Sequence, residues 1–248
     1  MSRLVRAIRR RLSRITQGKL QGKQNYLPYV TNKCGLEIGG PSELFRQRHL
    51  IDIYGSAASI DNCDFSQTTV WADQKEYFSF HPDKNPGKSI FCDGSALVSI
   101  GDGTYDFVLS CHNLEHFANP VKALKEWKRV LRPSGALILV LPYYKQTFDH
   151  RRSPTPVNHM LEDFDRNVGE DDLTHLAEIL EKHDLSMDRA AGTKEQFHRR
   201  SLDNLSNRCL HHHVFNQSNS VDLLKQSGFN VHSVALVHPH HIYLLAAV

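Results

Sequence analysis

A glycine turn after a short apolar run is the first feature of this chain that could do chemistry. Residues 35–42 read Gly-Leu-Glu-Ile-Gly-Gly-Pro-Ser, so Glu37 precedes Gly39 and Gly40. Glycines let the backbone approach a ligand closely, the next helix offers unpaired N–H groups, and the carboxylate can accept a proton from a ligand hydroxyl or ammonium. Two adjacent glycines also mark ordinary tight turns. The motif alone therefore does not decide between a cofactor site and an ordinary tight turn.

Acids also end the next two predicted strands. The run ending at residue 60 is followed by Asp61 and Asn62, and the run ending at residue 92 by Asp93 and Gly94. In a doubly wound sheet, the acid ending the second strand lies beside the first glycine turn, where it can accept both ribose hydroxyls of an adenosine. A fourth strand, 105–111, leads into histidines at 112 and 116. We expect these side chains to meet at the carboxyl edge of one sheet.

Caps and apolar runs predict the elements that position these residues. Asn119 and Pro120 start a helix that stops at residues 133–135, and 135–142 is typical of a fully buried parallel strand. A helix over 216–228 follows later in the chain and ends at a glycine. Strands and helices therefore alternate, which predicts an α/β fold built on a parallel sheet.

The last two apolar runs, 229–237 and 242–248, predict an antiparallel closing hairpin. Its turn holds His238, His240 and His241, which we expect to lie remote from the cofactor edge. The whole pattern predicts a Rossmann-like, doubly wound sheet of seven mostly parallel strands. The last strand is antiparallel, and a helical insertion follows strand 5.

Between residues 34 and 143 the chain resembles the class I S-adenosylmethionine-dependent methyltransferases. The resemblance includes Leu-Glu-Ile-Gly-Gly at 36–40, Asp61 and Cys-Asp-Gly at 92–94. Its most specific parts are two blocks, Tyr-Asp-Phe-Val-Leu-Ser-Cys-His-Asn-Leu-Glu-His at 105–116 and Leu-Lys-Glu-Trp-Lys-Arg-Val-Leu-Arg-Pro-Ser-Gly-Ala-Leu-Ile-Leu-Val-Leu-Pro at 124–142. One departure is Pro41 and Ser42, where many members continue with alternating glycines.

This resemblance implies S-adenosyl-L-methionine as the cofactor and assigns roles to the residues that match. It implies that the cofactor-binding residues are Glu37 near the methionine ammonium, Gly39 and Gly40 under the sugar, Asp61 and Asn62 at the ribose, Asp93 and Gly94 at the adenine amine, and Ser110 and Cys111, with His112, closing over the cofactor.

Residues 143–215 are the least generic part of the predicted methyltransferase domain, 34–248. A minimal fold of this kind needs only a short loop and one helix there, so we interpret the segment as a substrate-recognition insertion with a polar pocket for sugar-like hydroxyls. Arg151 and Arg152 can also hold a phosphate or carboxylate as a fork. The substrate-binding candidates are Tyr143, Arg151, Arg152, Asp172, His175, His212 and His213.

Methyl transfer to a hydroxyl needs a positioned acceptor and a base that removes its proton. A neutral imidazole suits the base. His116, which follows the fourth strand, is the first candidate, with Glu115 to orient it, and His112 and His150 come next. A nitrogen or carbon acceptor needs less from a base, so these residues leave the acceptor atom open.

The chain holds 16 histidines, which raises the question of a metal. A cluster drawn from Asp149, His150, Asp171, Asp172, His175 and His211–His213 is one option. However, the sequence has no His-x-x-x-His pair with a third ligand at zinc spacing, and paired aspartates before a helix are more often a cap. We therefore expect no metal.

Charge is distributed unevenly. Residues 1–36 contain nine Lys and Arg and no acid, whereas acids outnumber bases in the rest of the chain. The acidic body argues against a nucleic-acid substrate, which needs a basic face. The 1–33 arm carries apolar residues at helical spacing, a pattern that suits contact of residues 1–20 with an anionic membrane surface, a helix docked on the domain, or an organellar transit peptide.

Five dispersed cysteines, at 34, 63, 92, 111 and 209, indicate a reducing compartment and predict a cytoplasmic protein, with membrane-surface association through the arm as an option. No apolar run in the sequence is long enough to span a bilayer. The sequence leaves the oligomeric state open.

The predicted function is S-adenosylmethionine-dependent methyl transfer to a small-molecule or glycan acceptor. Overall resemblance to methyltransferases of bacterial surface-polysaccharide and secondary-metabolite pathways favours an oxygen of a sugar. One alternative is a nicotinamide-dependent oxidoreductase, which the missing third glycine of the first turn disfavours. Another is a catalytically degenerate binding scaffold, which Pro41 and Ser42 favour and the acids at 37, 61 and 93 oppose.

Overall fold

In a computed structural model, residues 25–46, 51–69 and 76–248 are described. The expected helix of residues 1–20 and most of the 1–33 arm lie outside these ranges. The strands are β1 (Cys34–Ile38), β2 (Ser59–Asp64), β3 (Tyr77–Phe78), β4 (Gly87–Phe91), β5 (Tyr105–Cys111), β6 (Leu131–Pro142), β7 (Asn230–Val237) and β8 (His241–Ala247). The helices are α2 (Leu27–Val30), α3 (Ile53–Ser56), α4 (Pro120–Val130), α5 (Val157–Asp165), α6 (Leu176–Lys182), α7 (Lys194–Leu202), α8 (Asn204–Asn207) and α9 (Gln217–Gln226).

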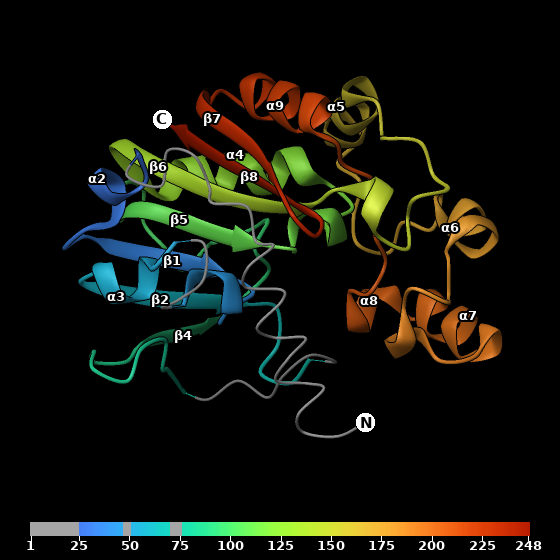
Figure 1. The fold of residues 1–248 in the computed structure, drawn as a ribbon, viewed down its shortest axis with the longest axis horizontal. Helices are drawn as coiled ribbons and strands as arrows, with labels where there is room; N and C mark the ends of the chain where they lie inside the picture. Colours follow the sequence, from blue (N-terminus) through green and yellow to red (C-terminus); the bar gives the residue numbers. More distant parts are fainter. Residues whose placement is uncertain (1–24, 47–50, 70–75) are drawn as a thin grey trace.

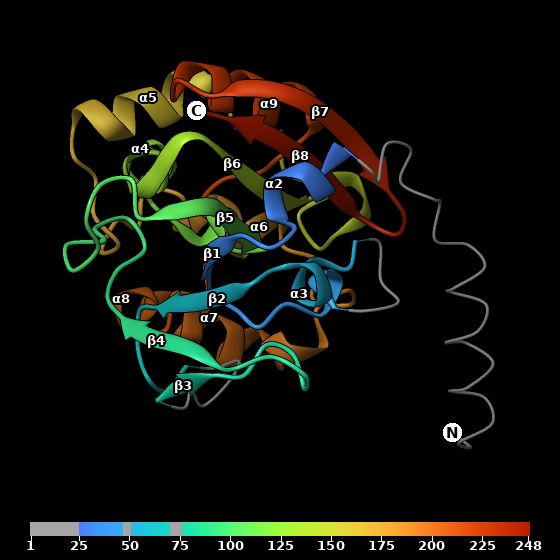
Figure 2. The ribbon, with the colours of Figure 1, turned by 90° about the vertical axis from the view of Figure 1, so that its left-hand side faces the viewer.

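The strands form one sheet in the order β3-β4-β2-β1-β5-β6-β8-β7 (Figure 1, with β3 labelled in Figure 2). Strands β4, β2, β1, β5 and β6 pair in parallel, and β8 lies antiparallel between β6 and β7. The α/β prediction and the closing hairpin are confirmed. The sheet has eight strands rather than seven among the described residues, because the two-residue β3 pairs antiparallel with β4 at one edge. A strand of two residues shows no alternation in the sequence.

Helices cover both faces of the sheet, as Figure 2 shows. On one face, Trp127 of α4, Met160 of α5 and Leu223 of α9 belong to one apolar core with the sheet. On the other face, Val30 of α2 and Tyr54 of α3 belong to a second core. Burial on both sides explains why β5 and β6 are nearly continuous apolar runs.

Two helices begin where local chemistry predicts, although α4 ends at Val130, before the predicted stop at 133–135, because β6 already starts at Leu131. The Asn119 side chain accepts a hydrogen bond from the Lys122 N–H, and Pro120 occupies the first turn of α4. Helix α9 begins with a capping box and is followed by Gly228 at φ +86°.

Helices α6, α7 and α8 lie beyond one end of the sheet (Figure 1). They have a small apolar core of their own, made by Ile179, Ala191, Phe197 and Leu210. Among the helices of the described ranges, none combines the length and apolar character that a membrane span requires.

Candidate cofactor and acceptor site

A cavity of about 470 Å³ lies where β1, β2, β4 and β5 end. Its lining comes from the turn 38–44, residues 63–65, residues 93 and 94, residues 111–113, and residues 116 and 117. Glu170 and Arg208 reach it from the α5–α8 region, and His240 and His241 from the closing hairpin. The carboxyl end of a doubly wound sheet is the usual place for a ligand, and the volume suits a small molecule.

The glycine turn requires both of its glycines. Gly39 has φ +76°, and a Cβ there would lie 2.8 Å from the Asn113 side-chain nitrogen. A Cβ on Gly40 would lie 2.4 Å from the carboxyl carbon of Glu37. The Gly40 N–H donates to the Asn62 side chain at 2.8 Å. The turn therefore presents bare backbone to the cavity, and Asn62 holds it from below.

Glu37 lies beneath this turn and is absent from the part of the cavity lining formed by the described residues. Its carboxyl is fully buried and accepts hydrogen bonds from the Ser42 N–H at 3.0 Å and the Tyr54 hydroxyl at 2.6 Å. The sequence predicted that Glu37 contacts the methionine ammonium directly. In the structure its carboxyl instead accepts the hydrogen bonds that hold the turn. Burial raises the pKa of Glu37 to about 7.

This raised pKa predicts a pH dependence of stability. In the unfolded chain the carboxyl ionises near pH 4.5, so between about pH 4.5 and 7 the folded state holds the extra proton. Unfolding then releases a proton, and the contribution to stability is lost as pH rises through that window, by up to about 3 kcal/mol. We expect the unfolding free energy of Glu37→Gln, measured in urea between pH 5 and 8, to lack the decrease that this carboxyl causes in the parent.

Glu43→Gln is the matched control, because Glu43 lies in the same loop but its side chain is 70% exposed. It should follow the parent's pH profile. A Glu37→Gln profile that keeps the full pH dependence of the parent would contradict the assignment.

The acid of β2 that reaches the cavity is Asp64, three residues beyond Asp61. Asp61 pairs in register with Leu36, and its carboxylate accepts hydrogen bonds from the Lys88 N–H and the Tyr105 hydroxyl, both at 2.8 Å. Three residues of strand span about 10 Å, so Asp61 lies well below the glycine turn. The sequence interpretation ended β2 too early, whereas the strand runs to Asp64, which lies level with Gly39.

Asp93 and Gly94 line the cavity, and their contact with the adenine amine stays a prediction. One Asp93 oxygen accepts from the N–H and hydroxyl of Ser95, and the other lies 3.2 Å from Arg208 Nη2. Arg208 Nη1 lies 3.1 Å from the Glu170 carboxylate. The sequence interpretation missed Arg208 and Glu170 as cavity residues, although Glu170 adjoins Asp171 and Arg208 lies close to His211–His213, which it did consider. Of the other cofactor candidates, Cys111 lines the cavity and Ser110 is buried in β5.

Histidines meet the cavity from two directions. His112 and His116 line it, as expected, and so do His240 and His241. His112 Nε2 lies 2.9 Å from His241 Nδ1. The expectation that the hairpin turn is remote from the site is wrong, because β8 is antiparallel to β6 and therefore begins at the carboxyl edge.

His116 is arranged as a neutral imidazole. Its Nδ1 lies 3.1 Å from the Leu210 carbonyl oxygen, which can only accept, so Nδ1 carries the proton and Nε2 the lone pair. Burial, together with nearby His211, holds the pKa of His116 well below its ordinary value. His150 lies apart from the cavity, with Nδ1 3.1 Å from the Thr147 carbonyl oxygen and Nε2 3.7 Å from Asp184.

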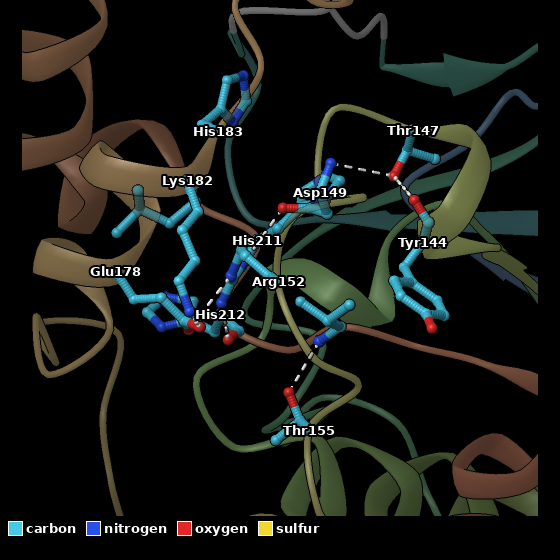
Figure 3. Close-up of polar contacts among 12 residues, drawn as sticks. Tyr144, Thr147, Asp149, Arg152, Thr155, Glu178, Lys182, His183, His211 and His212 are labelled. Carbon is cyan, nitrogen blue, oxygen red and sulfur yellow. Dashed lines mark hydrogen bonds and ion pairs between the residues drawn. The ribbon is translucent and has the colours of Figure 1, made fainter.

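Three of the seven substrate-binding candidates, Arg152, His212 and His213, are buried in the interior of residues 143–215. Arg152 is buried, with Nη1 3.1 Å from Asp149 and 2.7 Å from the His211 carbonyl oxygen, and Nη2 3.1 Å from the His212 carbonyl oxygen (Figure 3). His211 Nδ1 donates to the same Asp149 carboxylate at 2.6 Å. Burial alone would raise the pKa of Asp149, but His211 and Arg152 outweigh it and lower the pKa to about 2.

The remaining candidates also have structural partners. His212 is buried beside the Asn204 side chain at 3.0 Å, His213 lies against the Ala118 carbonyl at 3.2 Å, and His175 lies 3.0 Å from His159. Asp172 accepts from Thr174, and Arg151 pairs at the surface with Asp184. Tyr143 packs on Tyr144. None of the seven belongs to the cavity lining that the described ranges define.

The described site fits an adenosine-bearing cofactor: bare glycine backbone faces the cavity, and carboxylates end β2 and β4. Residues 38–139 match the family model of the methyltransferase domain. This part of the chain, 38–139, is a methyltransferase domain.

Two solved structures share the fold of this methyltransferase domain. The S-adenosylmethionine-dependent methyltransferase from Mesorhizobium loti is 14% identical, with a TM-score of 0.53 over 93% of this chain and 97% of that chain. A structure titled "putative S-adenosylmethionine dependent methyltransferase from Listeria monocytogenes" is 16% identical, with a TM-score of 0.50 over 93% of this chain and 96% of that chain. At these identities the likeness establishes the fold.

One curated relative matches over 61 residues at 39% identity: "Probable methyltransferase ltbC" of Aspergillus luteorubrus. The match covers 23% of this chain and 21% of the relative. The matching segment thus spans about a fifth of that protein's length.

Proposed function

We propose that this chain transfers a methyl group from S-adenosylmethionine to a hydroxyl of a small-molecule or glycan acceptor. The observation that carries the proposal is one cavity lined by the glycine turn, Asp64, Asp93 and His116. Asp64 would take the ribose hydroxyls, Asp93 the adenine amine, and Gly39 and Gly40 the sugar. Cys111 and His112 would close over the cofactor, and Glu37 and Asn62 support the turn.

When bound, S-adenosylmethionine supplies an electrophilic methyl group on a sulfonium. His116 acts as the general base: its Nε2 accepts the proton of the acceptor hydroxyl, which makes the oxygen a stronger nucleophile. His112, the second candidate for the base, also lines the cavity. His150 is the weakest of the three candidates, since it lies against Asp184 away from the cavity.

Residues 143–215 would recognise the acceptor, because Glu170 and Arg208 project from this segment into the cavity. Arg208 joins it to Asp93, so the cofactor and acceptor sides share one ion-pair network. Hydroxyl groups suit such a polar wall. We expect a cytoplasmic enzyme that acts on no nucleic acid, and the membrane contact of residues 1–20 stays a prediction.

Calorimetry with S-adenosylmethionine tests the cofactor site. The parent chain should bind, and Asp64→Asn should lose at least about tenfold in affinity, since charge-assisted hydrogen bonds to the ribose are worth about 1.5–3 kcal/mol. Asp61→Asn is the matched control on the same strand and should bind like the parent. Loss of binding in Asp61→Asn alone would contradict the assignment, and no binding by the parent would favour a scaffold.

A further inference from the structure

Four metal-ligating side chains meet outside the cofactor cavity. His159 and Asp163 lie one turn apart on α5, His175 lies directly before α6, and His213 lies in the segment that leads to α9. One ligand atom from each lies within 4.8 Å of all the others. Three segments separated by up to 54 residues of sequence thus converge on one point.

The distances between these ligand atoms suit one small cation. His159 Nε2 lies 3.0 Å from His175 Nε2 and 3.4 Å from Asp163 Oδ2, and His213 Nε2 lies 3.8 Å from Asp163 Oδ2. Nitrogen and oxygen ligands at about 2.0–2.2 Å from a tetrahedral Zn²⁺ lie about 3.3–3.6 Å from each other. The three observed separations bracket this range.

Two polar atoms of this quartet (His159, Asp163, His175 and His213) are buried without a hydrogen-bond partner within the described ranges. The Asp163 side chain is 6% exposed, and its Oδ2 has no hydrogen-bond partner within the described ranges. His213 is fully buried, and its Nδ1 likewise lacks a partner there. Its Nε2 lies 3.2 Å from the Ala118 carbonyl oxygen, a contact that zinc binding at Nε2 would replace. A buried carboxylate oxygen without a donor is costly, and a bound cation would offset that cost.

We propose that His159, Asp163, His175 and His213 bind one Zn²⁺ as a structural site. Three imidazoles and one carboxylate are typical zinc donors, and four protein ligands leave no open position for chemistry. This departs from the expectation of no metal, which considered spacing along the sequence. Here the ligands come from three segments, and only His159 and Asp163 share a helix.

Zinc at this quartet would fix the wall of the cavity that carries Glu170 and Arg208. His213 follows His212, which lies 3.0 Å from the Asn204 side chain, and that side chain also donates to the Glu170 carbonyl oxygen at 3.2 Å. His175 lies five residues after Glu170 along the chain, so a metal at His175 would also restrain Glu170. The metal would therefore hold the acceptor side in place without touching the cofactor.

Two other groups of three meet the same distance limit within the described residues. They are His112 with His240 and His241, and Glu115 with His116 and His211. Each offers three ligands rather than four, and each includes residues that line the cavity. They are the alternative locations that an experiment has to separate from the quartet.

Metal content and zinc affinity of the full-length chain, purified without a histidine tag, test the proposal. We expect one Zn²⁺ per chain by elemental analysis. His175→Ala and Asp163→Asn should weaken Zn²⁺ binding more than about 100-fold. Even changes to residues that only hydrogen-bond to a metal ligand lower metal affinity about 10–100-fold. The probe is Zn²⁺ in competition with a chromogenic chelator.

Two histidine variants serve as controls. His198→Ala removes an exposed histidine of α7, and His241→Ala removes one from the alternative group in the cavity. Both should keep the parent's zinc affinity. A chelator should lower the melting temperature of the parent and of both controls, and leave that of His175→Ala unchanged.

The proposal is overturned if the parent binds no Zn²⁺, if His175→Ala keeps stoichiometric zinc, or if zinc is lost in His241→Ala alone. Circular dichroism of Asp163→Asn, whose side chain keeps its shape, checks that loss of zinc is not loss of fold. Zinc binding is read without S-adenosylmethionine, so failure here is distinguishable from failure of the proposed methyl transfer.

Discussion

Arg152→Met should destabilise the protein by about 3–5 kcal/mol in urea unfolding at pH 7. Arg152 has a side chain that is 1% exposed, and it contacts Asp149, Glu178 and the carbonyl oxygens of His211 and His212. Methionine fills a similar volume, so the loss reports the charge and its hydrogen bonds. Among the described residues, the variant leaves the buried Asp149 carboxylate with His211 as its remaining ion-pair partner.

Arg151→Met is the matched control for this prediction. The Arg151 side chain is 53% exposed, and its one ion-pair partner among the described residues is Asp184. Exposed pairs contribute about 0–1 kcal/mol, so the control should unfold close to the parent. Equal effects of the two variants would show that Arg152 is not the centre of the segment's interior. They would also support the sequence prediction that Arg151 and Arg152 together bind a phosphate or carboxylate of the acceptor.

His116→Gln should lower kcat about 10²–10⁴-fold, the contribution expected of a general base. Gln can still donate to the Leu210 carbonyl, so the local fold should persist. The measurement is release of S-adenosylhomocysteine with the first acceptor that a screen of sugars and phenols identifies. Affinity for S-adenosylmethionine should stay within about threefold of the parent, because the lost interaction acts on the acceptor.

His150→Gln is the control for His116→Gln. It also replaces a histidine hydrogen-bonded to a carbonyl, but one that lies away from the cavity, and it should leave kcat nearly unchanged. An unchanged kcat in His116→Gln would remove this residue as the base and make His112 the next variant to measure.

Local sequence signals were sufficient for the frame of the fold. The cap at Asn119, the proline at 120 and the apolar run to Pro142 predicted α4 and β6, and the two terminal runs predicted the hairpin of β7 and β8. These signals are local because a cap or a periodic apolar face is satisfied within a few residues. The glycine turn was also readable, because a positive φ at Gly39 requires glycine.

Strand register was decided only by the tertiary structure. Asp61 and Asn62 are polar and mimic a strand end, but β2 continues because Cys63 is buried opposite Ile38. The acid at the cavity is therefore Asp64. The place of the hairpin turn likewise depends on β8 running antiparallel beside β6, which brings His241 to His112.

The roles of polar residues in 143–215 were also outside the reach of the sequence. Arg152 and Arg151 are identical in type and adjacent, yet one is buried and the other exposed. Their difference arises from contacts with residues some 30 to 60 positions away. Composition determined that this segment is polar and histidine-rich. Long-range packing decided which side chains build its interior and which, like Arg208 and Glu170, reach the cavity, because burial depends on the whole chain and not on neighbours in sequence.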